Sequence, residues 1–206
     1  MRNRLLIGIG LLGAGIAACR RAQPAREIPM APSHVEEGEG PAAPVSADLE
    51  TGPVRVAGIA FAPPAAWRRE APASAMRAAQ FAIPGSAGEK DGAVAVYYFG
   101  SGQGGGIAAN AKRWQEQFSG QSSPGTVTSL DKNGVKVTVV TAEGTYASGM
   151  PMGPSTPEPG FALWGAIIEA PQGNVFVKAT GPKSLIERSR SDFDALLSSL
   201  QTSTSM

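Results

Sequence analysis

The chain has 206 residues, with 18 Lys and Arg against 17 Asp and Glu. This near-neutral balance, without a basic cluster, argues against a nucleic-acid partner, because a phosphate backbone requires a concentrated basic surface. One Cys and one His in the whole chain argue against zinc sites, disulfides and Cys/His nucleophilic catalysis.

The first 19 residues, MRNRLLIGIGLLGAGIAAC, have the features of an export signal. Arg2 and Arg4 precede an apolar stretch, 5–16, that is too short to span a bilayer as a mature helix. Residues 16–19, IAAC, resemble a bacterial lipobox. The resemblance implies that residues 1–18 are a signal peptide and that Cys19 becomes the acylated amino terminus of the mature protein.

Acylation at Cys19 predicts attachment to a membrane through the lipid. Each buried CH₂ contributes about 0.8 kcal/mol, so two or three fatty acyl chains of palmitate length anchor a protein stably where one does not. We therefore expect a lipoprotein of the cell envelope. Arg20 stands where an Asp would resemble an inner-membrane retention signal, which favours the outer membrane, facing the periplasm, in a Gram-negative cell. The alternative is an ordinary cleaved signal with an incidental Cys.

The segment 19–53 is predicted to be a disordered tether, because it is rich in Pro and has few, unpatterned apolar residues. His34 falls within it, so no metal site is expected there. A globular domain is predicted over 54–201, followed by a short disordered tail, 202–206.

Apolar patterns within the domain predict the following elements. Strands are expected at 54–63, 75–84 and 92–100, the last of them central in the sheet. A helix after the glycine run buries a stripe formed by Ile107, Ala111, Trp114 and Phe118. Two hairpins follow, at 126–130 with 135–146 and at 162–170 with 174–181, separated by a mobile loop over 150–160. The last helix covers 186–200, where Ser191 could cap a fresh start.

These elements predict an α+β fold in which a single, mainly antiparallel sheet of about seven strands packs with two principal helices. Three segments then suggest a family: NAKRW (110–114), FVKATGP (176–182) and FDALL (193–197). In this order they resemble the PsbP-like α/β/α sandwich, over roughly 54–200, and uncharacterised bacterial lipoproteins of that architecture. The resemblance implies an architecture and not an activity, since that fold serves unrelated functions.

The glycine run raises the question of nucleotide binding, because Gly100, Gly102 and Gly105 match G-x-G-x-x-G. That fingerprint requires a parallel βαβ unit, whereas the Asn133-Gly134 turn predicts an antiparallel hairpin. No Gly-Lys-Ser/Thr closes the run either, so no nucleotide is expected. The glycines are interpreted as a strand-to-helix connection with positive φ. An alternative is an anion held by backbone N–H groups near Gly102 and Gly105.

Four polar side chains are the remaining binding candidates. Asn110, Arg113 and Gln117 form a second face of the first helix, where Arg113 suits a carboxylate, a phosphate or a partner's backbone. The alternative is a solvated helix face. Lys178 shares a strand face with Phe176 and Thr180, and is either a snorkelling edge lysine or part of a site.

Catalysis, metals and cofactors are not predicted, because no G-x-S-x-G occurs and the domain contains no histidine. The first functional hypothesis is therefore a non-enzymatic binding or accessory module that meets another envelope protein through the 110–117 helix face or the 100–106 loop. The rival hypothesis is an envelope small-ligand binder or hydrolase with its site at the 100–106 glycine loop.

Overall fold

The computed structural model of the protein describes residues 52–121, 125–147 and 156–203. Contacts divide the chain into two units, Met1–Val45 and Ser46–Met206, and all described residues belong to the second. The predicted signal peptide, Cys19 and nearly all of the predicted tether lie outside the described residues. Within the described ranges, no helix has the length and apolar character needed to cross a membrane.

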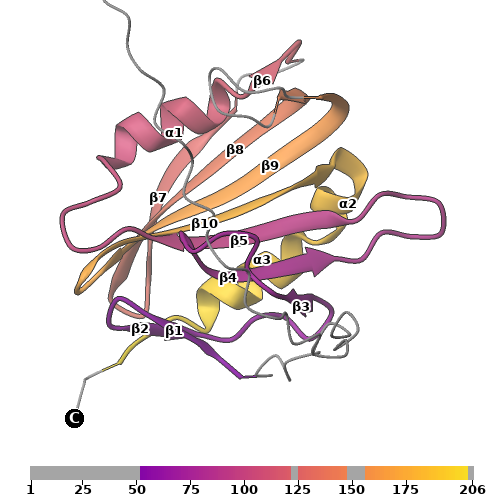
Figure 1. Cartoon of the computed structure of the whole chain (residues 1–206). Coiled ribbons are helices and arrows are strands. Elements are labelled where there is room, and N and C mark those ends of the chain that lie inside the picture. The colour runs from indigo at the N-terminus through magenta and orange to yellow at the C-terminus, as the bar shows by residue number, and fades with distance from the viewer. Residues whose placement is uncertain (1–51, 122–124, 148–155, 204–206) are drawn as a thin grey trace, which may run out of the picture. The chain divides into compact units, whose positions relative to one another are not determined.

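A large antiparallel sheet forms the centre of the domain (Figure 1). Its order is β3-β4-β5-β10-β9-β8-β6, and β7 also pairs with β8. The bounds of these strands are β3 Arg68–Glu70, β4 Arg77–Ile83, β5 Gly92–Tyr98, β6 Phe118–Ser119, β7 Val127–Lys132, β8 Val135–Ala147, β9 Pro157–Ala170 and β10 Gly173–Pro182. The long strands β8, β9 and β10 are central and rich in apolar residues, because both of their faces are covered.

Helices cover both faces of this sheet (Figure 1). α1 (Ile107–Gln115) lies on one face, while α2 (Lys183–Arg188) and α3 (Arg190–Ser198) lie on the other. Alternation along β9 supplies both cores: Leu163 and Ile167 join the cluster under α1, and Trp164 and Ile168 join the larger cluster under α2 and α3. The face under α1 is where the candidate site lies.

A second, three-stranded sheet consists of β1 (Val54–Val56), β2 (Ile59–Phe61) and β11 (Gln201–Thr202), in the order β1-β2-β11. Ala57 and Gly58 have φ of 51° and 80°, which makes the two-residue turn between β1 and β2. Ile59 and Phe61 are buried in the larger core cluster, so this small sheet closes over the α2–α3 side. Its last strand extends one residue past the predicted end of the domain.

The predicted fold class is wrong in two respects. The structure is mostly β, with an eight-stranded antiparallel sheet and a separate three-stranded sheet instead of one sheet of about seven strands. It also has three short helices instead of two principal ones, within the described residues. The apolar run 54–63 is not the single strand that its composition predicts, because its Ala57-Gly58 turn folds it into a hairpin.

Other differences follow from short or polar segments. β3 is a polar edge strand, Arg-Arg-Glu, without the alternation that identifies a strand in a sequence. β9 begins at Pro157, inside the segment predicted as a loop. The C-terminal helix is split at Ser189, two residues before the predicted restart, and Ser189 is buried at the junction.

Several elements are as predicted. β5 lies between β4 and β10, so it is central. The Asn133-Gly134 turn joins β7 to β8 with φ of 56° and 79°, and β9 pairs with β10 across the 171–173 turn. Both neighbours of β5 are antiparallel to it, so the glycine run does not sit in a parallel βαβ unit.

Candidate functional site

Four predicted polar residues lie together in one cavity under α1. The cavity has a volume of about 160 Å³. Its floor comes from β5 and β10 and one wall comes from α1. We call it the basic cavity, and it is lined by Tyr97, Phe99, Asn110, Arg113, Trp114, Gln117, Phe176 and Lys178.

The glycine run is tied to α1 through a buried asparagine. Asn110 is only 2% exposed, and its Nδ2 donates to the Gly104 carbonyl at 2.9 Å and to the Gly106 carbonyl at 3.0 Å. Gly104 has φ of 85°, and a Cβ at that position would lie 2.7 Å from the Phe176 ring and 2.8 Å from the Phe99 ring. Glycine is required there because both the backbone and the aromatic side chains exclude a side chain.

Arg113 is positioned by the same asparagine. Its Nη2 donates to Asn110 Oδ1, so one amide holds both the loop carbonyls and the guanidinium. Arg113 is otherwise exposed at the mouth of the cavity. An arginine held in this way still has N–H groups free to meet an anion, since a guanidinium carries five donors.

Lys178 lies at the base of the cavity. Its Nζ donates to Gln117 Oε1 at 2.5 Å and to the Tyr146 hydroxyl at 3.0 Å, and sits 5.0 Å from the centre of the Tyr146 ring. Burial, together with the nearby charges of Arg113 and Arg77, lowers the pKa of Lys178 to about 8. β10 is an interior strand, so the interpretation of Lys178 as an edge lysine is wrong.

The charged side chains that line the basic cavity, Arg113 and Lys178, are both positive. None of the ion pairs among the described residues involves Arg77, Arg113 or Lys178. Arg77 donates to Gln80 Oε1 at 2.5 Å and lies 5.7 Å from the centre of the Tyr97 ring. The hydrogen-bond acceptors that these cations use are neutral, so the cavity carries uncompensated positive charge.

The two glycine candidates do not line this cavity. Gly102 has open space around its Cα, and Gly105 is exposed, with its virtual Cβ 3.4 Å from Asn110 Nδ2. Both have positive φ, a backbone conformation that glycine adopts without strain. The sequence-based reasoning missed the aromatic wall, although the alternation in Tyr97-Tyr98-Phe99 already placed Tyr97 and Phe99 on one strand face.

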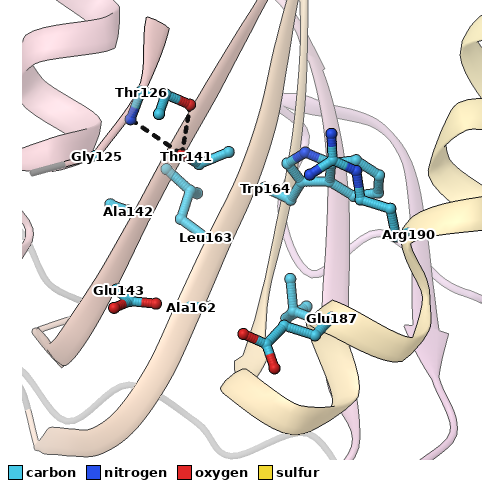
Figure 2. Close-up of a pocket in the computed structure, with 11 residues that line it drawn as sticks. Gly125, Thr126, Thr141, Ala142, Glu143, Ala162, Leu163, Trp164, Glu187 and Arg190 are labelled. Carbon is cyan, nitrogen blue, oxygen red and sulfur yellow. Dashed lines mark hydrogen bonds between the residues drawn. The ribbon is translucent and has the colours of Figure 1, made fainter. Parts of the chain in front are cut away.

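A second cavity, of about 300 Å³, lies on the opposite face of the sheet (Figure 2). Trp164 and Ala162 form its floor, and Glu143, Glu187 and Arg190 lie around it. Figure 2 shows the Arg190 side chain across the Trp164 ring, 5.0 Å from its centre. The Trp164 indole nitrogen has no hydrogen-bond partner within the described part of the chain.

The charges of this second cavity compensate one another. Lys183 Nζ lies 2.7 Å from Glu143 Oε2 and 3.8 Å from Glu187 Oε1, and Arg190 Nε lies 3.9 Å from Asp194 Oδ2. A ligand there would compete with existing ion pairs. The smaller basic cavity therefore has the stronger claim to a binding function.

Within the described residues, no group of His, Cys, Asp and Glu side chains is arranged to hold a metal ion. Comparison with models of known protein families finds no match, and a search of curated proteins finds no relative. The resemblance to PsbP-like lipoproteins has no support from these searches, and the function has to be argued from the cavity itself.

Proposed function

We propose that this protein is a lipid-anchored, non-enzymatic binding module of the cell envelope, and that its domain binds an anionic group in the basic cavity. The observation that carries the proposal is the convergence of Arg113 and Lys178 on one cavity whose lining contains no carboxylate. An uncompensated buried cation is costly, and a bound anion relieves that cost.

The two cations have complementary roles in the proposed binding. Arg113 presents a planar fork at the cavity mouth, which suits two oxygens of a carboxylate or phosphate. Lys178 contributes a point charge at the base, where low polarity strengthens electrostatic attraction. Asn110 and Gln117 hold these two groups in place before a ligand arrives, so little further ordering is needed on binding.

The proposal moves the site from the 100–106 loop to the basic cavity. The lining contains no serine, cysteine, histidine or carboxylate, so it offers neither a Ser–His nor a Cys–His pair of nucleophile and base. Binding without turnover is the function that this set of side chains supports best.

Binding of acetate should perturb the side-chain amide NMR signals of Asn110 and Gln117 in the full chain, held in detergent. Arg113→Gln or Lys178→Gln should weaken binding by about tenfold or more, because a hydrogen bond to a charged group contributes about 1.5–3 kcal/mol. Acetate affinity should also fall as pH rises through about 8, where free Lys178 loses its proton. Burial raises the pKa of Tyr146, which faces Lys178 together with Arg77 and Arg113, so the fall in acetate affinity near pH 8 belongs to Lys178.

Lys112→Gln is the matched control, because Lys112 lies on the same helix but its side chain is 77% exposed and pairs with Glu116. It should leave the acetate titration unchanged. Equal losses of acetate affinity in Lys112→Gln and Arg113→Gln would mean that acetate responds only to the net charge of the domain and not to a specific site. No perturbation of Asn110 or Gln117 at any acetate concentration would refute an anion site in the basic cavity.

The anchor is a separate part of the proposal and has its own test. Cys19→Ser should abolish incorporation of labelled palmitate and leave the precursor at its full mass, because serine offers no thiol for the thioether. Metabolic labelling and mass spectrometry of the membrane fraction measure both. Persistent labelling of the Cys19→Ser variant would rule out Cys19 as the acylated residue.

A further inference from the structure

Four aromatic side chains line the basic cavity beside its charged and amide groups. Tyr97 and Phe99 stack with ring centres 6.0 Å apart, and Phe99 and Phe176 lie 5.8 Å apart. Trp114 meets Phe176 edge-on at 6.3 Å. One ligand would therefore meet both aromatic rings and the charges of Arg113 and Lys178.

The volume of the basic cavity matches about one ring. An apolar cavity of about 150 Å³ accommodates a benzene molecule, and the basic cavity has about 160 Å³. This space suits a six-membered ring whose charged substituent reaches out to the cations. It is too small to enclose a long acyl chain or a nucleotide.

Phe99 gives this wall an exposed edge. Phe99 is 39% exposed, one of few large apolar side chains with that much exposure in the described chain. Its ring is held from behind, because Gly104 packs against both Phe99 and Phe176 without space for a Cβ. The wall is thus formed in advance. Phe176 and Trp114 are already buried, so a ligand ring placed on the wall would remove mainly the exposed surface of Phe99 from solvent.

We propose that the ligand of the basic cavity is a small carboxylate carrying a single aromatic ring, with the ring against Phe99, Phe176 and Trp114 and the carboxylate on Arg113 and Lys178. This inference rests on the proposed function and narrows it to one ligand class. Edge-to-face and offset contacts favour an aromatic ring over a saturated one of the same size.

Four probes that vary the ring and the charge separately test it by calorimetry on the full chain in detergent. Benzoate carries ring and charge, cyclohexanecarboxylate a saturated ring and charge, acetate the charge alone, and benzamide the ring alone. Benzoate should bind about tenfold or more tightly than acetate and benzamide, and about threefold to tenfold more tightly than cyclohexanecarboxylate. Phe99→Ala should reduce benzoate affinity to the level of acetate.

The outcomes separate the two proposals. If acetate and benzoate bind equally well, the ligand class is wrong and the anion site stands. If cyclohexanecarboxylate equals benzoate, the preference for an aromatic ring is refuted, again without affecting the anion site. If benzamide equals benzoate, or if no carboxylate binds, both the ligand class and the anion-binding function are refuted.

Discussion

Replacing Phe193 by alanine should lower the free energy of unfolding by about 3–5 kcal/mol, the cost of removing a large aromatic side chain from a packed core. Phe193 on α3 is 0% exposed, with its ring centre 3.8 Å from that of Trp164 and 6.5 Å from that of Trp67. It therefore links α3 to β9 and to the segment that precedes β3. The melting temperature should fall by on the order of 10 °C, measured by circular dichroism.

Phe99→Ala is the matched control for this loss of stability. The same side chain is removed, but Phe99 lies partly exposed at the cavity mouth, so the free energy of unfolding should change by about 1 kcal/mol or less. Urea unfolding of both variants measures the two losses. An unchanged slope of the free energy of unfolding against urea concentration would show that the folded and unfolded states are otherwise similar. If Phe193→Ala lowered the free energy of unfolding no more than Phe99→Ala, the burial of Phe193 between α3 and the sheet would be refuted.

Replacing Gly165 by alanine should disturb both stability and binding. A Cβ on Gly165 would lie 2.4 Å from Trp114 Cζ3 and 2.7 Å from Cε3, closer than real contacts allow. Gly165 is fixed by pairing with both β8 and β10, so the strain falls on Trp114 and on α1. We expect a loss of about 1–3 kcal/mol, typical of overpacking, together with weaker acetate and benzoate binding.

Two further variants test the origin of that effect. Gly52→Ala places a methyl group where no atom lies within 4 Å, and should change stability little. Trp114→Leu introduced together with Gly165→Ala should cost less than the sum of the two separate changes, because the smaller side chain relieves the collision. Additive losses in a double-mutant cycle would show that the two residues do not meet.

The sequence predicted the long elements well and the short ones poorly. β5, β8 and β10 are seven or more residues long and rich in apolar residues, so the strands could be recognised. The turn at Asn133-Gly134 could be recognised because Asn-Gly readily adopts the positive φ that a tight hairpin turn requires. β3, β6 and β11 contain two or three residues each. Segments that short pair because of tertiary contacts and have no readable period, so the second sheet and the strands β3 and β6 of the large sheet could not be predicted.

The candidate site was predicted residue by residue but not as a cavity. Helical spacing placed Asn110, Arg113 and Gln117 on one face of the predicted helix, although α1 ends at Gln115 and Gln117 follows it. Strand alternation placed Lys178 opposite Val177. Whether the helix face meets that strand face depends on where α1 crosses the sheet. That crossing depends on Gly165, where the absence of a side chain lets Trp114 approach, and no local pattern marks such a position.

The small sheet has a consequence for the order in which the chain acquires its structure. β2 pairs with β1 on one side and with β11 on the other, joining Ile59 to Thr202. A ribosome delivers residues from the amino end, so the hairpin of β1 and β2 keeps one edge of β2 unpaired until β11, about 140 residues later, has emerged. Pairing of β2 with β11 closes a long loop and is therefore slow, and until it occurs the unpaired edge of β2 can be bound by a chaperone or by another chain.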